Sequence, residues 1–265
     1  MRGWFILLKK EYRMARTSAF VLLAMLIIAG LWVLYLNRGN MGIILAPASL
    51  LIIFGLFYPA LFMLKSVYSE LKNTPHLWLH CPQPAWMLLS AKLVMAVGVM
   101  LAILAVDAVF VYTIIFSTPE INAMGKIGIS AGNLALFVTE VGVYVTIATI
   151  GVSIYMAAWS SLMAVATVGS RHVLGRFNWL AGLGVFLIAT WGMGKLHSSW
   201  LYKTLTKWGG FKIKLLSLNK VLPAAANDNP FGGLELYAGE IFAILIATVS
   251  IFALSSWLID NKVEV

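Results

Sequence analysis

Residues 88–115, LLSAKLVMAVGVMLAILAVDAVFVYTII, decide the fold class of this chain. Only two charged side chains interrupt the stretch, Lys92 near its start and Asp107 in its second half. A helix of about 20 apolar residues crosses the ~30 Å hydrocarbon core of a bilayer. The stretch is long enough and apolar enough to do so, and it is predicted to be a membrane-spanning helix.

Five further stretches of the same character flank it, so that six spans are predicted. They are residues 18–36, 41–64, 88–115, 131–158, 179–196 and 236–259. The fourth is longer than a bilayer requires, which predicts tilt or an extension beyond the interface. The fifth is short and rich in glycine. We therefore expect an all-α polytopic membrane protein in which residues 1–265 form a single transmembrane domain.

The composition excludes other classes. Hydrophobic residues make up 61% of the chain and charged residues 11%, against roughly 45–50% and about 25% in soluble domains. The net charge of +9 lies in short segments between apolar blocks, which favours membrane electrostatics over nucleic acid as its cause. The single cysteine, Cys81, allows no internal disulfide, and four scattered histidines have no zinc-site spacing. We expect no metal and no nucleic-acid partner.

Residues 1–17 precede the first span and are too polar to cross a membrane. On a helix, apolar and basic side chains separate onto two faces, with Trp4, Leu7, Leu8 and Tyr12 opposite Lys9, Arg13 and Arg16. This pattern predicts an amphipathic interfacial helix with a cationic face for anionic headgroups. A frayed basic N-terminus is the alternative. No small-residue cleavage site follows the first apolar block, so we expect the segment to be retained.

Lysine and arginine predict the orientation of the spans. Five basic residues precede the first span, and Arg38 alone lies directly after it, which places the N-terminus in the cytoplasm by the positive-inside rule. An even number of spans places the C-terminus there too. Residues 65–87 then form a cytoplasmic loop and residues 197–235 a large external loop, in a multi-pass protein of the plasma (inner, cytoplasmic) membrane.

The external loop alternates large apolar side chains with lysines. Its apolar members are Trp200, Leu205, Trp208, Phe211, Leu215 and Leu218. Such a pattern predicts a structure lying on the outer leaflet, with aromatic rings at headgroup depth and lysines directed outward. Membrane lipids are therefore an expected partner.

Motifs for catalysis are missing from the sequence. The nearest string to a phosphate-binding loop, Gly192-Met-Gly-Lys195, lacks the earlier glycine and the following Ser or Thr. Neither a His-Glu-x-x-His metalloprotease motif nor a Gly-x-Ser-x-Gly nucleophile motif occurs. Cys81 beside His76 and His80 has no orienting acid, and an ordinary loop thiol is the preferred interpretation. We expect no enzyme activity and no cofactor of the chain's own.

Polar side chains within the spans are costly and mark candidate functional positions. We select Asp107 in the third span and Glu140, Thr146 and Ser153 in the fourth as candidates for a translocation path or a subunit seam. Asp107 lies on a different side of its helix from the small residues Gly98, Ala102 and Ala105. The alternative is that these groups only hold neighbouring helices together.

The cytoplasmic loop carries a resemblance to a known family. In order, the chain has Glu70, Asn73-Thr74, Leu77, Leu79, Pro82-x-Pro84 and Leu88-Leu89-x-Ala91-Lys92. This order resembles that of the ABC-2 type permeases, and Leu7-Leu8-Lys9-Lys10-Glu11-Tyr12 looks like that family's interfacial "elbow" helix. One departure is Cys81-Pro82-Gln83-Pro84, where relatives more often carry Leu-Pro-x-Ser. Another is the long basic external loop.

The resemblance implies the permease subunit of a bacterial ATP-binding cassette exporter. Such a subunit pairs with a second permease copy or paralogue as a homo- or heterodimer, and separate ATPase subunits bind ATP and Mg²⁺. Prolines around Leu77-Trp78-Leu79 form a stiff apolar knob suited to a groove on a partner. The residues expected to couple to the ATPase are Glu70, Leu77, Trp78, Leu79, Pro82 and Pro84. Trp78 as an interfacial belt residue is the alternative.

Two other functional classes stay open. One is a non-transporting membrane sensor or immunity protein that uses the basic external loop, and the other is an intramembrane enzyme acting on lipid or peptide. The sequence does not determine the cargo of an exporter. The external loop, rich in lysine and tryptophan, favours an amphipathic peptide or antibiotic or a lipid-linked substrate.

Overall fold

A computed structural model describes residues 2–36, 42–73, 83–117, 131–212, 217 and 235–262. Within these ranges six helical stretches are long and apolar enough to cross a membrane. They are Gly3–Trp32, Leu51–Asn73, Ala85–Thr113, Gly132–Gly169, Gly175–Ser198 and Ala238–Asn261. The prediction of an all-α polytopic membrane protein is confirmed.

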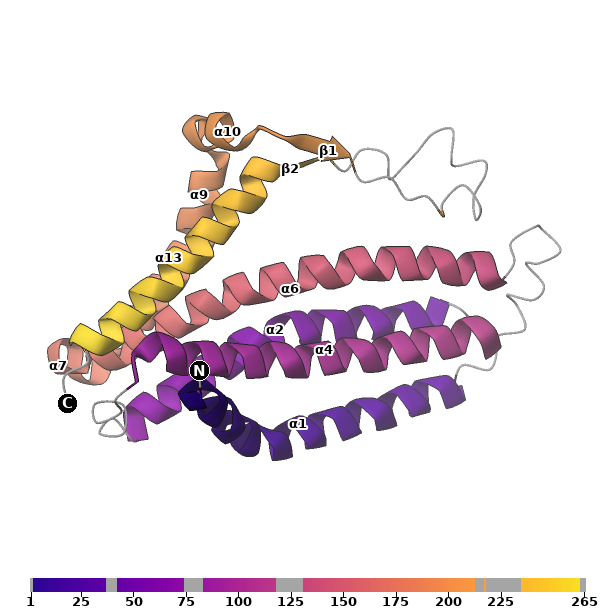
Figure 1. The fold of residues 1–265 in the computed structure, drawn as a ribbon, viewed down its shortest axis with the longest axis horizontal. Coiled ribbons are helices and arrows are strands. Elements are labelled where there is room, and N and C mark those ends of the chain that lie inside the picture. Colours follow the sequence, from indigo (N-terminus) through magenta and orange to yellow (C-terminus); the bar gives the residue numbers. More distant parts are fainter. Residues whose placement is uncertain are drawn as a thin grey trace.

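Four long helices run side by side in alternating directions (Figure 1). They are α1 (Arg2–Leu36), α2 (Gly42–Asn73), α4 (Ala85–Ser117) and α6 (Ala131–Gly169). All four extend beyond the predicted spans. With 39 residues, α6 is about 58 Å long, almost twice the thickness of the hydrocarbon core. Because α2 continues to Asn73, most of the first half of the predicted 65–87 loop is helical.

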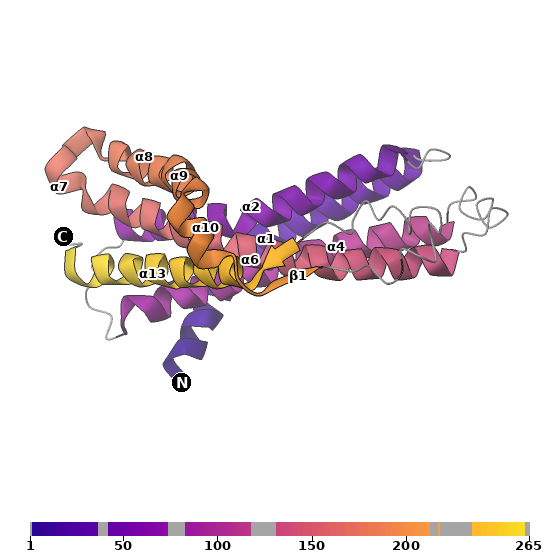
Figure 2. The same cartoon turned by 90° about the horizontal axis from the view of Figure 1, so that it is seen from above.

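The predicted interfacial segment and the first span form one continuous helix, α1. Its N-terminal part points away from the direction of the remainder in both views (Figures 1 and 2). Leu7, Glu11, Ala15 and Ala19 are buried, and their spacing of four residues defines one helix face. Tyr12, predicted to share the apolar face, is 54% exposed. The buried face therefore includes an acidic residue.

The fifth span is assembled from short pieces. After α7 (Arg171–Leu174) and the 3₁₀ turn η2 (Gly175–Phe177), α8 (Trp179–Leu187) continues through the π-helical turn η3 (Ile188–Gly192) into α9 (Met193–Ser198). The predicted boundaries, 179–196, agree closely with this composite helix.

The described parts of the predicted external loop lie next to the last span. The short helix α10 (Trp200–Thr206) is followed by β1 (Gly210–Lys212), which pairs antiparallel with β2 (Glu235–Tyr237). Strand β2 leads directly into α13 (Ala238–Lys262). The apolar side chains of Trp200, Leu205, Trp208 and Phe211 are exposed, as expected for lipid contact. Leu215 and Leu218 lie outside the described residues.

The apolar core lies at one end of the molecule, where α2, α4, α6 and α13 meet. Its buried side chains are Met63, Val67, Leu71, Ala85, Leu89, Ala157, Ala164, Val165, Val168 and Ile259. We call this end the base; it also holds the start of α1. Away from the base, α13 diverges from α6 (Figure 1). Beyond the base, a second buried cluster of Ala19, Val99 and Ile103 joins α1 to α4.

Candidate functional site

A buried lysine lies at the centre of the base. Lys92, in the third turn of α4, has no exposed surface. Its Nζ lies 2.9 Å from Glu11 Oε1, 2.9 Å from Glu70 Oε1 and 2.9 Å from Ser66 Oγ. An ammonium group has three N–H donors and no acceptor. All three donors of Lys92 therefore have an oxygen partner.

Lys92 and its partners belong to three helices, α1, α2 and α4. Glu11 lies on the buried face of α1, and Ser66 and Glu70 lie one helical turn apart on α2. At the outer edge, Lys10 Nζ lies 3.7 Å from Glu70 Oε1, and the Glu70 side chain is 17% exposed. Two cations thus face two carboxylates. Such pairing is what makes burial of these charges tolerable. We call Lys10, Glu11, Ser66, Glu70 and Lys92 the ionic network.

Apolar and neutral contacts reinforce the attachment of α1 to α4 beside the ionic network. Leu7 packs with Leu88 and Ala91. The indole Nε1 of Trp4 donates a hydrogen bond to Ser90 Oγ at 3.1 Å. The N-terminal part of α1 is therefore held by protein contacts at the first two turns of α4.

The helix α13 also contacts the start of α4. Asp260, near the end of α13, accepts a hydrogen bond at its Oδ1 from the backbone N–H of Ala85, the first residue of α4, at 3.2 Å. A carboxylate at a helix N-terminus satisfies a free N–H and interacts favourably with the helix dipole. Elements from both ends of the chain are thus joined to the start of α4.

Of the predicted coupling residues, the structure describes two. Glu70 belongs to the ionic network, and the carbonyl of Pro84 accepts a hydrogen bond from Met87 N at 3.0 Å where α4 begins. Leu77, Trp78, Leu79 and Pro82 lie outside the described residues. Glu70 lies near the end of α2 and Pro84 directly before α4. The other four predicted coupling residues belong to the connection between these two helices.

Sequence reasoning missed the partners of Glu70. Glu11 is the only acidic residue before the first span, and Lys92 is the only basic residue in the third. A lone charge of each sign at the ends of apolar helices was the available signal for a buried pair. Nothing in the spacing indicated Asp260 as a cap for α4, because 175 residues separate it from Ala85.

Asp107 faces the interior of the bundle. It is 6% exposed and continues the buried stripe of α4 that contains Lys92, Ala96 and Ile103. The structure shows no hydrogen bond or ion pair for it among the described residues. On another side of α4, Gly98 is exposed, and a Cβ added there meets no atom within 4 Å among those residues. The carboxyl and the small-residue stripe therefore face different surroundings.

The candidates on α6 serve other contacts. Glu140 Oε2 accepts hydrogen bonds from the backbone N, at 2.9 Å, and from the hydroxyl of Ser217. The Ser153 hydroxyl donates to the carbonyl of Leu56 on α2 at 2.9 Å. Thr146 lies between them and is half-buried. Because Glu140 and Ser153 are roughly 20 Å apart along the helix axis, they do not form one cluster.

The described part of the chain holds no group of three His, Cys, Asp or Glu side chains that could bind a metal ion. No family model, curated protein or solved structure matches the chain. Function is therefore argued from the ionic network and its surroundings.

Proposed function

We propose that this chain is the permease subunit of an ABC-2 type exporter, powered by separate ATPase subunits that dock at the base. The observation that supports this proposal best is the ionic network. It joins the end of α2 to the start of α4, the two helix ends that flank residues 74–84. A partner that pushes on this connection moves both helix ends together.

The physical reason is the rigidity of a saturated buried network. Removing one partner from a buried ion pair costs about 3–5 kcal/mol, so thermal motion rarely separates Lys92 from Glu11 and Glu70. Because α1 and α13 also attach to α4, through Trp4–Ser90 and Asp260–Ala85, the base acts as one body. Energy from ATP hydrolysis in the partner then reaches several spans at once.

In this proposal the conformational change takes place away from the base. There α13 diverges from α6 (Figure 1), and α4 carries the buried carboxyl of Asp107. Polar groups in spans are characteristic of substrate and ion pathways. In this proposal a second permease subunit completes the pathway, and Asp107 lies toward it when the helices separate.

The cargo is proposed from the exposed segment after the fifth span. Trp200 and Trp208 are exposed there, and exposed Lys203 and Lys207 lie between them. Side chains of this kind bind amphipathic molecules at a membrane surface. We propose export of an amphipathic peptide, an antibiotic or a lipid-linked substrate across the plasma membrane, with ATP and Mg²⁺ held by the partner.

Affinity purification of the tagged chain from its native membrane tests the proposal. We expect an ATPase with a phosphate-binding loop to co-purify, and the Leu77→Ser, Trp78→Ser, Leu79→Ser triple variant to lose it. The matched control changes three lipid-exposed residues of α1, Phe20, Ile28 and Leu31, to alanine and retains the partner. Full activity of the chain without any ATPase partner would overturn the proposal and favour a sensor or immunity protein.

A further inference from the structure

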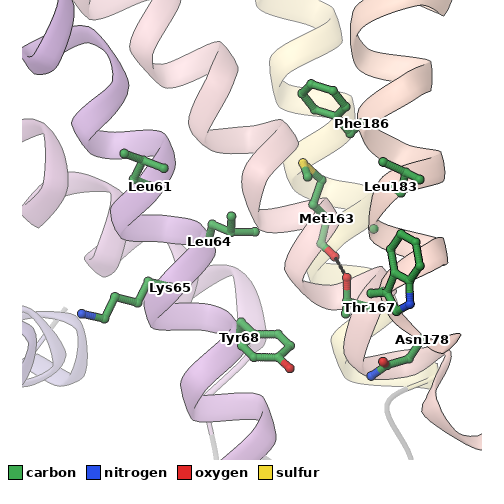
Figure 3. A pocket seen from close by; sticks show the side chains of 11 residues that line it. Leu61, Leu64, Lys65, Tyr68, Met163, Thr167, Asn178, Leu183 and Phe186 are labelled. Carbon is green, nitrogen blue, oxygen red and sulfur yellow. Dashed lines mark hydrogen bonds between the residues drawn. The ribbon is translucent and has the colours of Figure 1, made fainter. Parts of the chain in front are cut away.

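A groove of about 680 Å³ opens on the side of the base, between α2, α6 and α8 (Figure 3). Both α2 and α8 pack against α6, and the furrow lies between them. The close approach of α8 to α6 occurs at Gly182, where an added Cβ would collide with the Thr167 hydroxyl. The volume lies within the range of small-molecule binding sites.

The groove is polar at one end and apolar at the other. Leu61, Leu183 and Phe186 line one end, whereas the Tyr68 hydroxyl, Thr167 and Asn178 lie toward the other (Figure 3). This gradient matches the chain's own membrane boundaries. Along α2 the apolar run ends at Lys65, and along the chain entering α8 it begins after Asn178. The polar end of the groove therefore lies at headgroup depth and the apolar end at acyl-chain depth.

The charge around the polar end is positive. The ammonium of Lys65 points away from the groove (Figure 3), whereas Nζ of the exposed Lys72 lies 5.7 Å from the ring centre of Tyr68, which lines the groove. Arg171 and Arg176, both exposed, lie in the short connection between α6 and α8. No lining residue is acidic. Long basic side chains at this depth reach the headgroup plane, and basic pockets between spans bind anionic headgroups.

We propose that this groove binds one anionic glycerophospholipid from the leaflet at the base. An acyl chain lies along Leu61, Leu183 and Phe186, and the glycerol and headgroup lie at Tyr68 and Asn178. Lys72 and Arg176 supply the charge that selects an anionic headgroup over a zwitterionic one. This proposal does not depend on an ATPase partner. The groove fits a lipid because its lining changes from apolar to polar at the predicted boundary between the acyl chains and the headgroups.

Trp179 lines the groove and reports on its occupant. The full chain is reconstituted in phosphatidylcholine vesicles containing a small fraction of phosphatidylglycerol with brominated acyl chains, which quench tryptophan on contact. The contribution of Trp179 is the difference between the wild-type chain and Trp179→Phe. We expect saturable quenching, with half-maximal quenching at a lower mole fraction of brominated phosphatidylglycerol than of brominated phosphatidylcholine with identical chains. The difference should be about fivefold for each basic side chain that contacts the headgroup.

Charge variants separate the site from general lipid contact. Lys72→Glu together with Arg176→Glu abolishes the preference for phosphatidylglycerol, while Lys195→Glu on α9, exposed and outside the groove, leaves it unchanged. A monodisperse elution profile for each variant shows that it is folded. Equal quenching by both headgroups means bulk lipid contact only and overturns the proposal. Quenching by neither lipid means that protein, such as a second copy of the chain, covers the groove, and overturns it too.

Discussion

The ammonium of Lys92 and the carboxylate of Glu11 lie 2.9 Å apart in the protein interior, although 81 residues separate them in the chain. The contact joins the N-terminal part of α1 to α4, and Glu70 extends it to α2. One fully buried cation therefore determines how three helices meet. Buried charge pairs contribute specificity where a purely apolar contact would permit several arrangements, a role seen in some proteins.

Replacing Lys92 with methionine leaves Glu11 and Glu70 without the cation between them. We expect Lys92→Met to destabilise the protein by about 3–5 kcal/mol, measured as a lower thermal unfolding temperature in detergent. Lys9→Met, at an exposed position next to Lys10 in the chain, is the matched control and leaves the temperature unchanged. A triple variant with Glu11→Gln and Glu70→Gln added should regain much of the loss. Equal stability of Lys92→Met and Lys9→Met would contradict a structural role for the ionic network.

The Asp260 cap on α4 predicts a local effect. Asp260→Ala removes the acceptor of the Ala85 N–H and should cost about 0.5–2 kcal/mol. Amide hydrogen exchange over the first turn of α4 should become faster. Asp260→Asn retains an acceptor oxygen and should restore most of the protection. If exchange in this turn is the same in the alanine variant and the wild type, the cap contributes nothing.

Gly182 and Gly184 form a matched pair on α8. A Cβ at Gly182 meets Thr167, whereas one at Gly184 meets no described atom within 4 Å. We expect Gly182→Ala to lower the unfolding temperature, by an overpacking cost of about 1–3 kcal/mol, and Gly184→Ala to leave it unchanged or raise it slightly. Thr167→Ala should rescue Gly182→Ala. Without that rescue, the contact between α6 and α8 is not where the strain arises.

The strand pair should respond to acid. Lys212 Nζ lies 3.0 Å from Glu235 Oε1, and this hydrogen bond and charge lower the pKa of the Glu235 carboxyl below its usual value of 4.5. A depressed folded-state pKa adds stability that is present above pH 4.5 and is lost as the pH falls through the folded-state value. Amide protection of Gly210–Lys212 should decrease over that window. Glu235→Gln should remove this dependence, and an unaltered acid profile in that variant would refute the assignment.

Replacing Asp107 should raise the stability of the protein and abolish its transport function. A carboxyl buried in the bundle is costly without a partner, so Asp107→Leu is expected to raise the unfolding temperature. If Asp107 lies on the transport path, the same variant should lose export while remaining folded and bound to its ATPase. Lower stability in Asp107→Leu would mean that the carboxyl holds helices together instead. Growth in the presence of the exported compound provides the functional readout.

The apolar runs in the sequence predict the six spans, because a lipid-exposed helix must match the bilayer in length and exclude charge over that length. They predict less about helix ends. Residues 65–73 carry Lys65, Glu70 and Lys72, which argues against lipid burial but not against helix, and α2 continues through them. The same reasoning separated residues 1–17 from the first span, although the backbone of α1 is continuous.

Hydropathy by itself thus determined that this is a multi-pass membrane protein, with six candidate spans in the part that the structure describes, and that Lys92 and Asp107 are exceptional within their span. Only the tertiary structure decided that Lys92 has three partners and that Asp107 has none among the described residues. Hydrophobicity decides for each segment separately whether it enters the membrane. An ion pair, in contrast, depends on which helix faces pack together and bring the two charged groups within about 3 Å of each other. That choice is made by packing: the lone charges of Glu11 and Lys92 mark candidates for a pair, but the sequence does not say which helix faces meet.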